Sequence, residues 1–118
     1  MRYGMCATRL KHGNHKVVIN GEKFDSQREY SRYCQLRLEE CAGAISGLCR
    51  QVTFILAPPV FLDGRKKPAL RYVADFVYVR GEKRIIEDAK SPHLKKEPRY
   101  RIKKHLMMSV HNIEIQEA

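Results

Sequence analysis

The chain has 118 residues, which fits a single domain and leaves little room for a second hydrophobic core. No apolar run approaches the roughly 20 residues that cross a membrane, and no apolar signal segment follows Met1, so we expect a cytoplasmic protein. The chain carries 23 Lys and Arg against 13 Asp and Glu, a formal net charge of +10. This excess favours a polyanionic partner such as nucleic acid, without separating DNA from RNA or binding from cutting.

The first part of the chain predicts an arm, a strand and a helix. Residues 1–16 are polar and basic without periodicity, which predicts a flexible basic arm before a folded domain over residues 17–118. Val17–Ile19 predicts a short strand, and Ser26 with Glu29 is a capping-box pattern that begins a helix over residues 26–44. The apolar stripe expected to face the core is Tyr30, Cys34, Leu38, Cys41 and Ile45. The four cysteines of the chain show no metal-ligand spacing.

The middle of the chain predicts three strands. Residues 48–57 are rich in β-forming residues, and residues 58–69 predict a loop. Residues 70–79 are apolar on both faces apart from Arg71 and Asp75, which predicts a strand at the centre of a sheet. A turn over residues 80–83 connects it to a returning strand over residues 84–90.

The last part predicts a basic loop over residues 91–98, a helix over residues 99–111 and a closing strand over residues 113–116. The helix is expected to turn Ile102, Leu106, Ser109 and Val110 inward. The predicted order is β-α-β-β-β-α-β, an α/β domain with a central mixed sheet flanked by helices.

The hairpin turn fixes the alignment of the two central strands. If Gly81 and Glu82 are the two loop residues, with Gly81 at positive φ, then Asp75 directly faces Asp88 with Cβ atoms about 5 Å apart. Like charges at that distance repel, so the pair must either share a proton or hold a cation. Alternation places Lys90 on the face of Asp88 and turns Glu87 away, so no catalytic role is expected for Glu87. Asp88 and Lys90 could instead form a plain surface ion pair.

The segments Ala74-Asp75-Phe76 and Ile86-Glu87-Asp88-Ala89-Lys90 resemble the core of the PD-(D/E)xK nucleases. The chain from Gly21 onward also resembles a phage and prophage family of unknown function placed in that superfamily. The resemblance departs at Ser91, where many members have glycine. The segments that carry it are Phe24-Asp25-Ser26, Gly43, Ile45, Leu48, Gln51-Val52, Tyr72 to Phe76, Asp88 to Lys90, Tyr100 and Lys103-Lys104.

The resemblance implies a restriction-endonuclease-like fold, a homodimer and Mg²⁺ at the acidic cluster that includes Asp75 and Asp88, with Mn²⁺ as a substitute. It also implies a catalytic and metal-binding role for Glu29, which matches the acidic residue on the first helix of such nucleases. The alternative is that Glu29 only completes the capping box. We therefore expect Asp75, Asp88, Lys90 and Glu29 to be catalytic, with the three carboxylates as metal ligands.

Six cations lie within ten residues around the start of the second helix, and each is either a phosphate contact or part of a solvated helix face. Lys103 is expected to reach the acidic cluster, while Lys104 points away toward the DNA backbone. The six predicted DNA-binding residues are Lys95, Lys96, Arg99, Arg101, Lys103 and Lys104.

The leading expectation is a structure-specific endodeoxyribonuclease for branched DNA, such as a Holliday junction resolvase of phage recombination or replication. One alternative is a sequence-specific or degradative nuclease with the same chemistry. The other is a non-catalytic nucleic-acid-binding module that keeps the fold.

Overall fold

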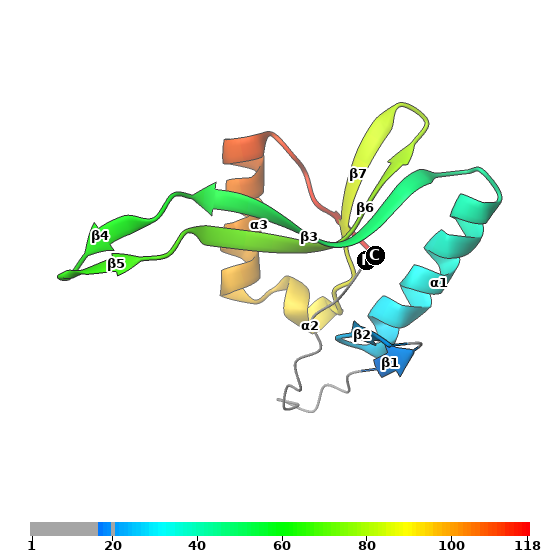
Figure 1. Cartoon of the computed structure of the whole chain (residues 1–118), viewed down its shortest axis with the longest axis horizontal. Coiled ribbons are helices and arrows are strands. Elements are labelled where there is room, and N and C mark those ends of the chain that lie inside the picture. Colours follow the sequence, from blue (N-terminus) through cyan, green and yellow to red (C-terminus); the bar gives the residue numbers. More distant parts are fainter. Residues whose placement is uncertain (1–16, 20) are drawn as a thin grey trace.

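The computed structural model describes residues 17–19 and 21–118, and the predicted arm over residues 1–16 lies outside this part of the chain. Three helices and eight strands are present in it (Figure 1). In chain order they are β1 (Val17–Ile19), β2 (Glu22–Phe24), α1 (Gln27–Cys41), β3 (Ser46–Ala57), β4 (Val60–Leu62), β5 (Arg65–Lys67), β6 (Leu70–Arg80), β7 (Lys83–Asp88), α2 (Pro92–Lys95), α3 (Pro98–His111) and β8 (Gln116–Glu117).

The main sheet has four strands in the order β3-β6-β7-β8. The pairs β3–β6 and β6–β7 are antiparallel, and β7–β8 is parallel, so the prediction of a mixed sheet in an α/β domain is confirmed. β6 lies between two partners, as its apolar pattern predicted. Two further hairpins, β1–β2 and β4–β5, were not predicted.

The β3–β6 ribbon is long, and α1 and α3 lie beside different parts of it (Figure 1). Two apolar clusters result. Tyr72 and Ala74 of β6 join the cluster that includes Met107 of α3, while Phe76 and Tyr78 join the cluster that includes Leu36 of α1. Along β6, the inward side chains before Asp75 therefore pack in the α3 cluster, and those after Asp75 pack in the α1 cluster.

Helix α1 begins after Ser26, whose hydroxyl accepts a hydrogen bond from the Glu29 amide at 3.1 Å, as predicted. The predicted inward stripe is partly wrong. Ile45 is buried in the core, but Leu38 is 72% exposed and Cys41 is also exposed. The buried residues of α1 are Glu29 and Leu36, and the charged Glu29 is tolerated in the interior because the buried Arg50 compensates its carboxylate.

Helix α3 begins at Pro98, and the Glu97 side chain caps it by accepting from the Tyr100 amide. The predicted inward residues are mostly wrong, since Ile102 and Val110 are 60% and 50% exposed. Tyr100 and Met107, seven residues apart, form the buried face. No helix in the described ranges is long and apolar enough to cross a membrane.

Candidate active site

The β6–β7 hairpin has the predicted register. Arg80 pairs with Lys83 and Phe76 pairs with Glu87, and Gly81 in the turn has φ 66°. The ladder ends at the Phe76–Glu87 pair, so Asp75 and Asp88 occupy the next positions, where the two strands separate. A turn of fixed length thus brings two carboxylates from distant points of the chain to one fork in the sheet.

Asp88 is buried, with only 1% of its surface exposed. Its Oδ2 accepts a hydrogen bond from the Tyr72 hydroxyl at 2.6 Å and lies 3.8 Å from the Lys90 Nζ. Its Oδ1 is buried and accepts no hydrogen bond within residues 17–19 and 21–118. A buried carboxylate oxygen without a donor is costly, so this atom is available to a cation or a proton.

Asp75 accepts a hydrogen bond on Oδ2 from the backbone amide of Ala89 at 3.0 Å and on Oδ1 from the side-chain amide of Gln51 at 3.4 Å. Burial, and then the neighbouring Asp88 and Glu29 carboxylates, raise the pKa of Asp75 to about 9. The side chain therefore holds a proton at neutral pH unless a cation compensates its charge.

Both carboxylate oxygens of Glu29 are held by hydrogen bonds. One carboxylate oxygen accepts from the Asp25 amide at 2.8 Å, beside the cap of α1. The other accepts from Arg50 at 3.2 Å and from Gln51 at 2.9 Å, and Gln51 also reaches Asp75. Burial raises the pKa of Glu29. The Gln51 side chain thus lies between the Glu29 and Asp75 carboxylates. The described residues contain no group of three acidic, histidine or cysteine side chains that could hold a metal.

Lys90 is half-buried, and its Nζ lies 5.1 Å from the centre of the Tyr100 ring. Tyr100 donates a hydrogen bond to Glu117 at 2.7 Å, and Lys104 pairs with the same carboxylate at 2.9 Å. The Lys104 Nζ also lies 6.0 Å from the centre of the Tyr100 ring, so Lys90 and Lys104 both contact this ring.

The six predicted DNA-binding cations divide into two sets. The paired cations, Lys95 and Lys104, lie within 4.0 Å of Glu117. The other four have no ion-pair partner in the part of the chain that the structure describes, and no contact of Lys103 with the acidic cluster is found there. These four open cations are Lys96, Arg99, Arg101 and Lys103.

Glu87 lies on the other face of the sheet, as alternation predicted. It is fully buried and accepts hydrogen bonds from Tyr78 at 2.6 Å and from Arg32 at 3.0 Å. The bidentate contact with Arg32 of α1 compensates its charge, so Glu87 fixes α1 on the sheet.

Two residues of the site were not singled out from the sequence. Tyr72 is buried in the core, and its hydroxyl also donates a hydrogen bond to Asp88. Gln51 has φ 54° and lies opposite Asp75, between the paired positions of Arg50 with Phe76 and Val52 with Ala74. A glutamine does not indicate that the backbone φ will be positive inside a strand, so only the resemblance pointed to this position.

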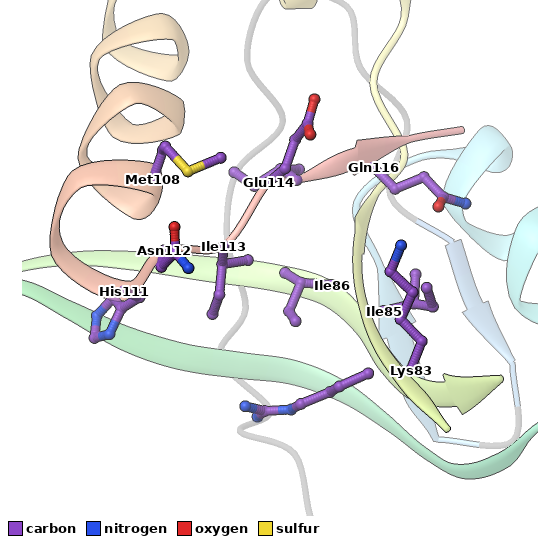
Figure 2. Close-up of a pocket in the computed structure, with 11 residues that line it drawn as sticks. Lys83, Ile85, Ile86, Met108, His111, Asn112, Ile113, Glu114 and Gln116 are labelled. Atoms are coloured by element: carbon purple, nitrogen blue, oxygen red, sulfur yellow. The ribbon is translucent and has the colours of Figure 1, made fainter. Parts of the chain in front are cut away.

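A hollow of about 670 Å³ lies elsewhere, between β7, the end of α3 and the segment leading to β8 (Figure 2). Ile86 and Ile113 line it, and His111 at its rim contacts the Ile55 carbonyl oxygen at 2.7 Å. None of Asp75, Asp88 and Lys90 lines this hollow, so it is separate from the acidic cluster.

Comparison with known proteins returned a family and no individual relative. No curated protein and no solved structure matched the chain. One family model, described as a protein of unknown function (DUF1064), matches residues 9–116. That range includes Glu29, Asp75, Asp88 and Lys90 together with every described helix. The chain therefore belongs to the DUF1064 family.

Proposed function

We propose that this protein is a PD-(D/E)xK nuclease, a metal-dependent endodeoxyribonuclease that hydrolyses phosphodiesters in branched DNA such as Holliday junctions. The observation that carries the proposal is the fork between β6 and β7. There Asp75 and Asp88 meet, the Asp88 Oδ1 has no hydrogen-bond donor among the described residues, and Lys90 lies beside the same carboxylate. Two neighbouring acids and a lysine at the end of a ladder suit a cation and a phosphate better than they suit a hydrophobic core.

The residues present fit Mg²⁺. This ion is commonly held by one or two carboxylates, and substrate phosphates and water complete its shell, so a third protein carboxylate is not required. Asp75 and Asp88 would hold it, and the unpaired Asp88 Oδ1 is a suitable ligand atom. Mn²⁺ accepts the same oxygen donors and should substitute. The bound ion supplies a Lewis acid next to the scissile phosphate.

The other side chains position and complement this charge. The Tyr72 hydroxyl donates a hydrogen bond to the Asp88 Oδ2, and the Lys90 ammonium lies close to the same oxygen. The Asp88 Oδ1 is therefore left for the metal ion. Lys90 orients the attacking water or steadies the negative charge that develops on the phosphate. Glu29 acts through Gln51, which donates to both Glu29 and Asp75, and it becomes a direct ligand only if that amide moves.

A homodimer with a restriction-endonuclease-like fold is part of the same proposal. Its support is the mixed sheet flanked by helices, together with apolar side chains that α1 and α3 leave exposed, Leu38 at 72% and Ile102 at 60%. A two-fold dimer would supply two sites for paired cuts on opposing strands of a junction. Such an enzyme would serve phage recombination or replication.

The test is cleavage of labelled four-way junction, fork and linear duplex, in Mg²⁺ and in EDTA. Wild type should cut the junction in Mg²⁺ only, and Asp88→Asn should not cut at all. Glu82→Gln, at an exposed carboxylate in the β6–β7 turn, is the matched control and should cut normally.

Equal cutting of linear duplex would identify a degradative or sequence-specific nuclease instead. Junction binding without any cutting in Mg²⁺ or Mn²⁺ would identify a non-catalytic module. Normal cutting by Asp88→Asn would refute the site.

A further inference from the structure

The segment over residues 58–69, predicted to be a loop, contains a two-stranded hairpin that we call the β4–β5 arm. β4 and β5 pair with each other and with no strand of the main sheet, and they lie at the far end of the long β3–β6 ribbon (Figure 1). Asp63 and Gly64 connect them, with φ 54° and 78°. Two consecutive left-handed residues make the tight turn that matches the twist of a hairpin, so the arm has a defined shape.

The two strands of the arm carry opposite kinds of side chain. β4 is wholly apolar and exposed, with Phe61 at 75%, Leu62 at 54% and Val60 at 49%. β5 consists of three cations, and the register places each of them opposite one apolar residue. The three pairs are Val60 with Lys67, Phe61 with Lys66 and Leu62 with Arg65.

The exposed surface continues from the arm toward the acidic cluster. On β6, Arg71 and Val73 are exposed, and they pair with Ile55 and Thr53 of β3, which are exposed as well. Their neighbours in sequence face α3 instead. Val73 is two residues from Asp75, so a ligand that follows this face from the arm arrives at the candidate active site.

We propose that the β4–β5 arm is a second DNA contact, which enters a groove of the duplex next to the cut site. This rests on the proposed function, because it takes DNA to be the substrate. Arg65, Lys66 and Lys67 lie against phosphates, and Phe61 lies against sugar or base edges. A two-stranded ribbon fits the major groove, which is about 12 Å wide, and apolar wedges flanked by cations are a recurrent means of entering the minor groove.

The charges favour DNA over a protein partner. A protein-binding strand would need apolar groups and could leave β5 neutral, whereas three consecutive cations on one short strand attract a polyanion. The chain also has ten more cationic than anionic side chains overall. Exposed apolar residues opposite cations therefore fit a groove, which has charged walls and a floor of base edges.

The test compares two charge-matched double variants. Arg65→Ala with Lys66→Ala removes two cations from the arm, and Arg37→Ala with Lys83→Ala removes two from exposed positions outside it. Binding to labelled duplex and junction is measured by anisotropy in EDTA over a series of salt concentrations. The arm variant should flatten the slope of log affinity against log salt by about 1.8, since each phosphate contact contributes about 0.9.

Phe61→Ser tests the apolar half of the arm. It should weaken binding by about tenfold and leave the salt slope unchanged, because it removes no charge. Sedimentation of each variant reports oligomeric state. The arm proposal is overturned if arm and control variants bind alike, or if Phe61→Ser separates a dimer while DNA binding is unaffected.

Cleavage in Mg²⁺ by the same samples separates the two proposals. Wild type that binds through the arm without cutting would refute only the nuclease. Wild type that cuts, with arm variants that bind and cut like the control, would refute only the arm.

Discussion

Asp75→Asn tests whether the paired acids destabilise the protein without a cation. Folding raises the pKa of Asp75 from 3.8 to about 9, because the carboxyl is buried beside Asp88 and Glu29. A raised acid pKa favours the protonated form in the fold, so its contribution to stability is complete below about pH 4. That contribution is lost as pH rises from 4 to 9.

The size of the effect follows from the same pKa. At pH 7 the unfolded carboxyl is ionised, 3.2 units above its pKa of 3.8, while the folded one is still protonated. At about 1.4 kcal/mol per unit, the ceiling is about 4 kcal/mol. Asp75 keeps part of its surface in water, so we expect roughly half of this. Asparagine is neutral in both states and retains an oxygen for the Ala89 amide, so the variant should be about 2 kcal/mol more stable.

Urea unfolding in EDTA at several pH values between 4 and 9 measures this difference. The advantage of Asp75→Asn over wild type should grow with pH and disappear near pH 4, and Mg²⁺ should stabilise wild type but not the variant. Asp63→Asn, exposed in the arm turn, should follow wild type throughout. A variant that is less stable than wild type at pH 7, with a parallel pH dependence, would refute the reasoning.

Three other predictions concern catalysis, DNA contact and the fold. Lys90→Ala should lower turnover by about 100-fold and affinity by less than about threefold, because one cation among 23 contributes little to phosphate attraction. Equal losses would make Lys90 a backbone contact. Alanine at two of the open cations, Arg99 and Arg101, should flatten the salt slope more than alanine at the two paired cations, which Glu117 already neutralises in part, and equal slopes in a salt titration would contradict this. Arg32→Ala should cost about 3 kcal/mol in urea unfolding, because it leaves the Glu87 carboxylate buried without its cation, and a loss below about 0.5 kcal/mol would exclude that role.

The parts of the site that local chemistry determines could be predicted from the sequence. The β6–β7 register follows from a glycine at one turn position, and this alone places Asp75 at the level of Asp88. The Ser26 cap of α1 is equally local. The β4–β5 arm could also have been predicted, because Asp63-Gly64 between an apolar and a basic run is a hairpin signal. The flanking prolines, however, favoured a loop.

The helix faces could not be predicted, because the hydrophobic period assumes that buried means apolar. In α1 the buried face includes Glu29, whose partners Arg50 and Gln51 lie on β3, more than twenty residues away. Leu38 and Cys41 of the apolar stripe that the period identified are exposed instead. A polar residue can occupy the interior only when its partners arrive there, and tertiary structure alone brings them together.

Placement of the acids at the end of a ladder explains how one small sheet can be both a stable fold and a site. Inside the ladder, Glu87 points to α1 and has three donors, so its charge is fixed and unavailable. One residue later the strands separate, and within the described part of the chain one Asp88 oxygen accepts a hydrogen bond while the other accepts none. Opposite Asp75, Gln51 adopts a left-handed backbone that costs a non-glycine residue about 1 kcal/mol, and the hydrogen bonds of its side-chain amide to Glu29 and Asp75 contribute to offsetting this cost. Strain, an unpaired oxygen and two facing carboxylates thus coincide at one fork, and a bound cation would relieve the electrostatic part of that cost.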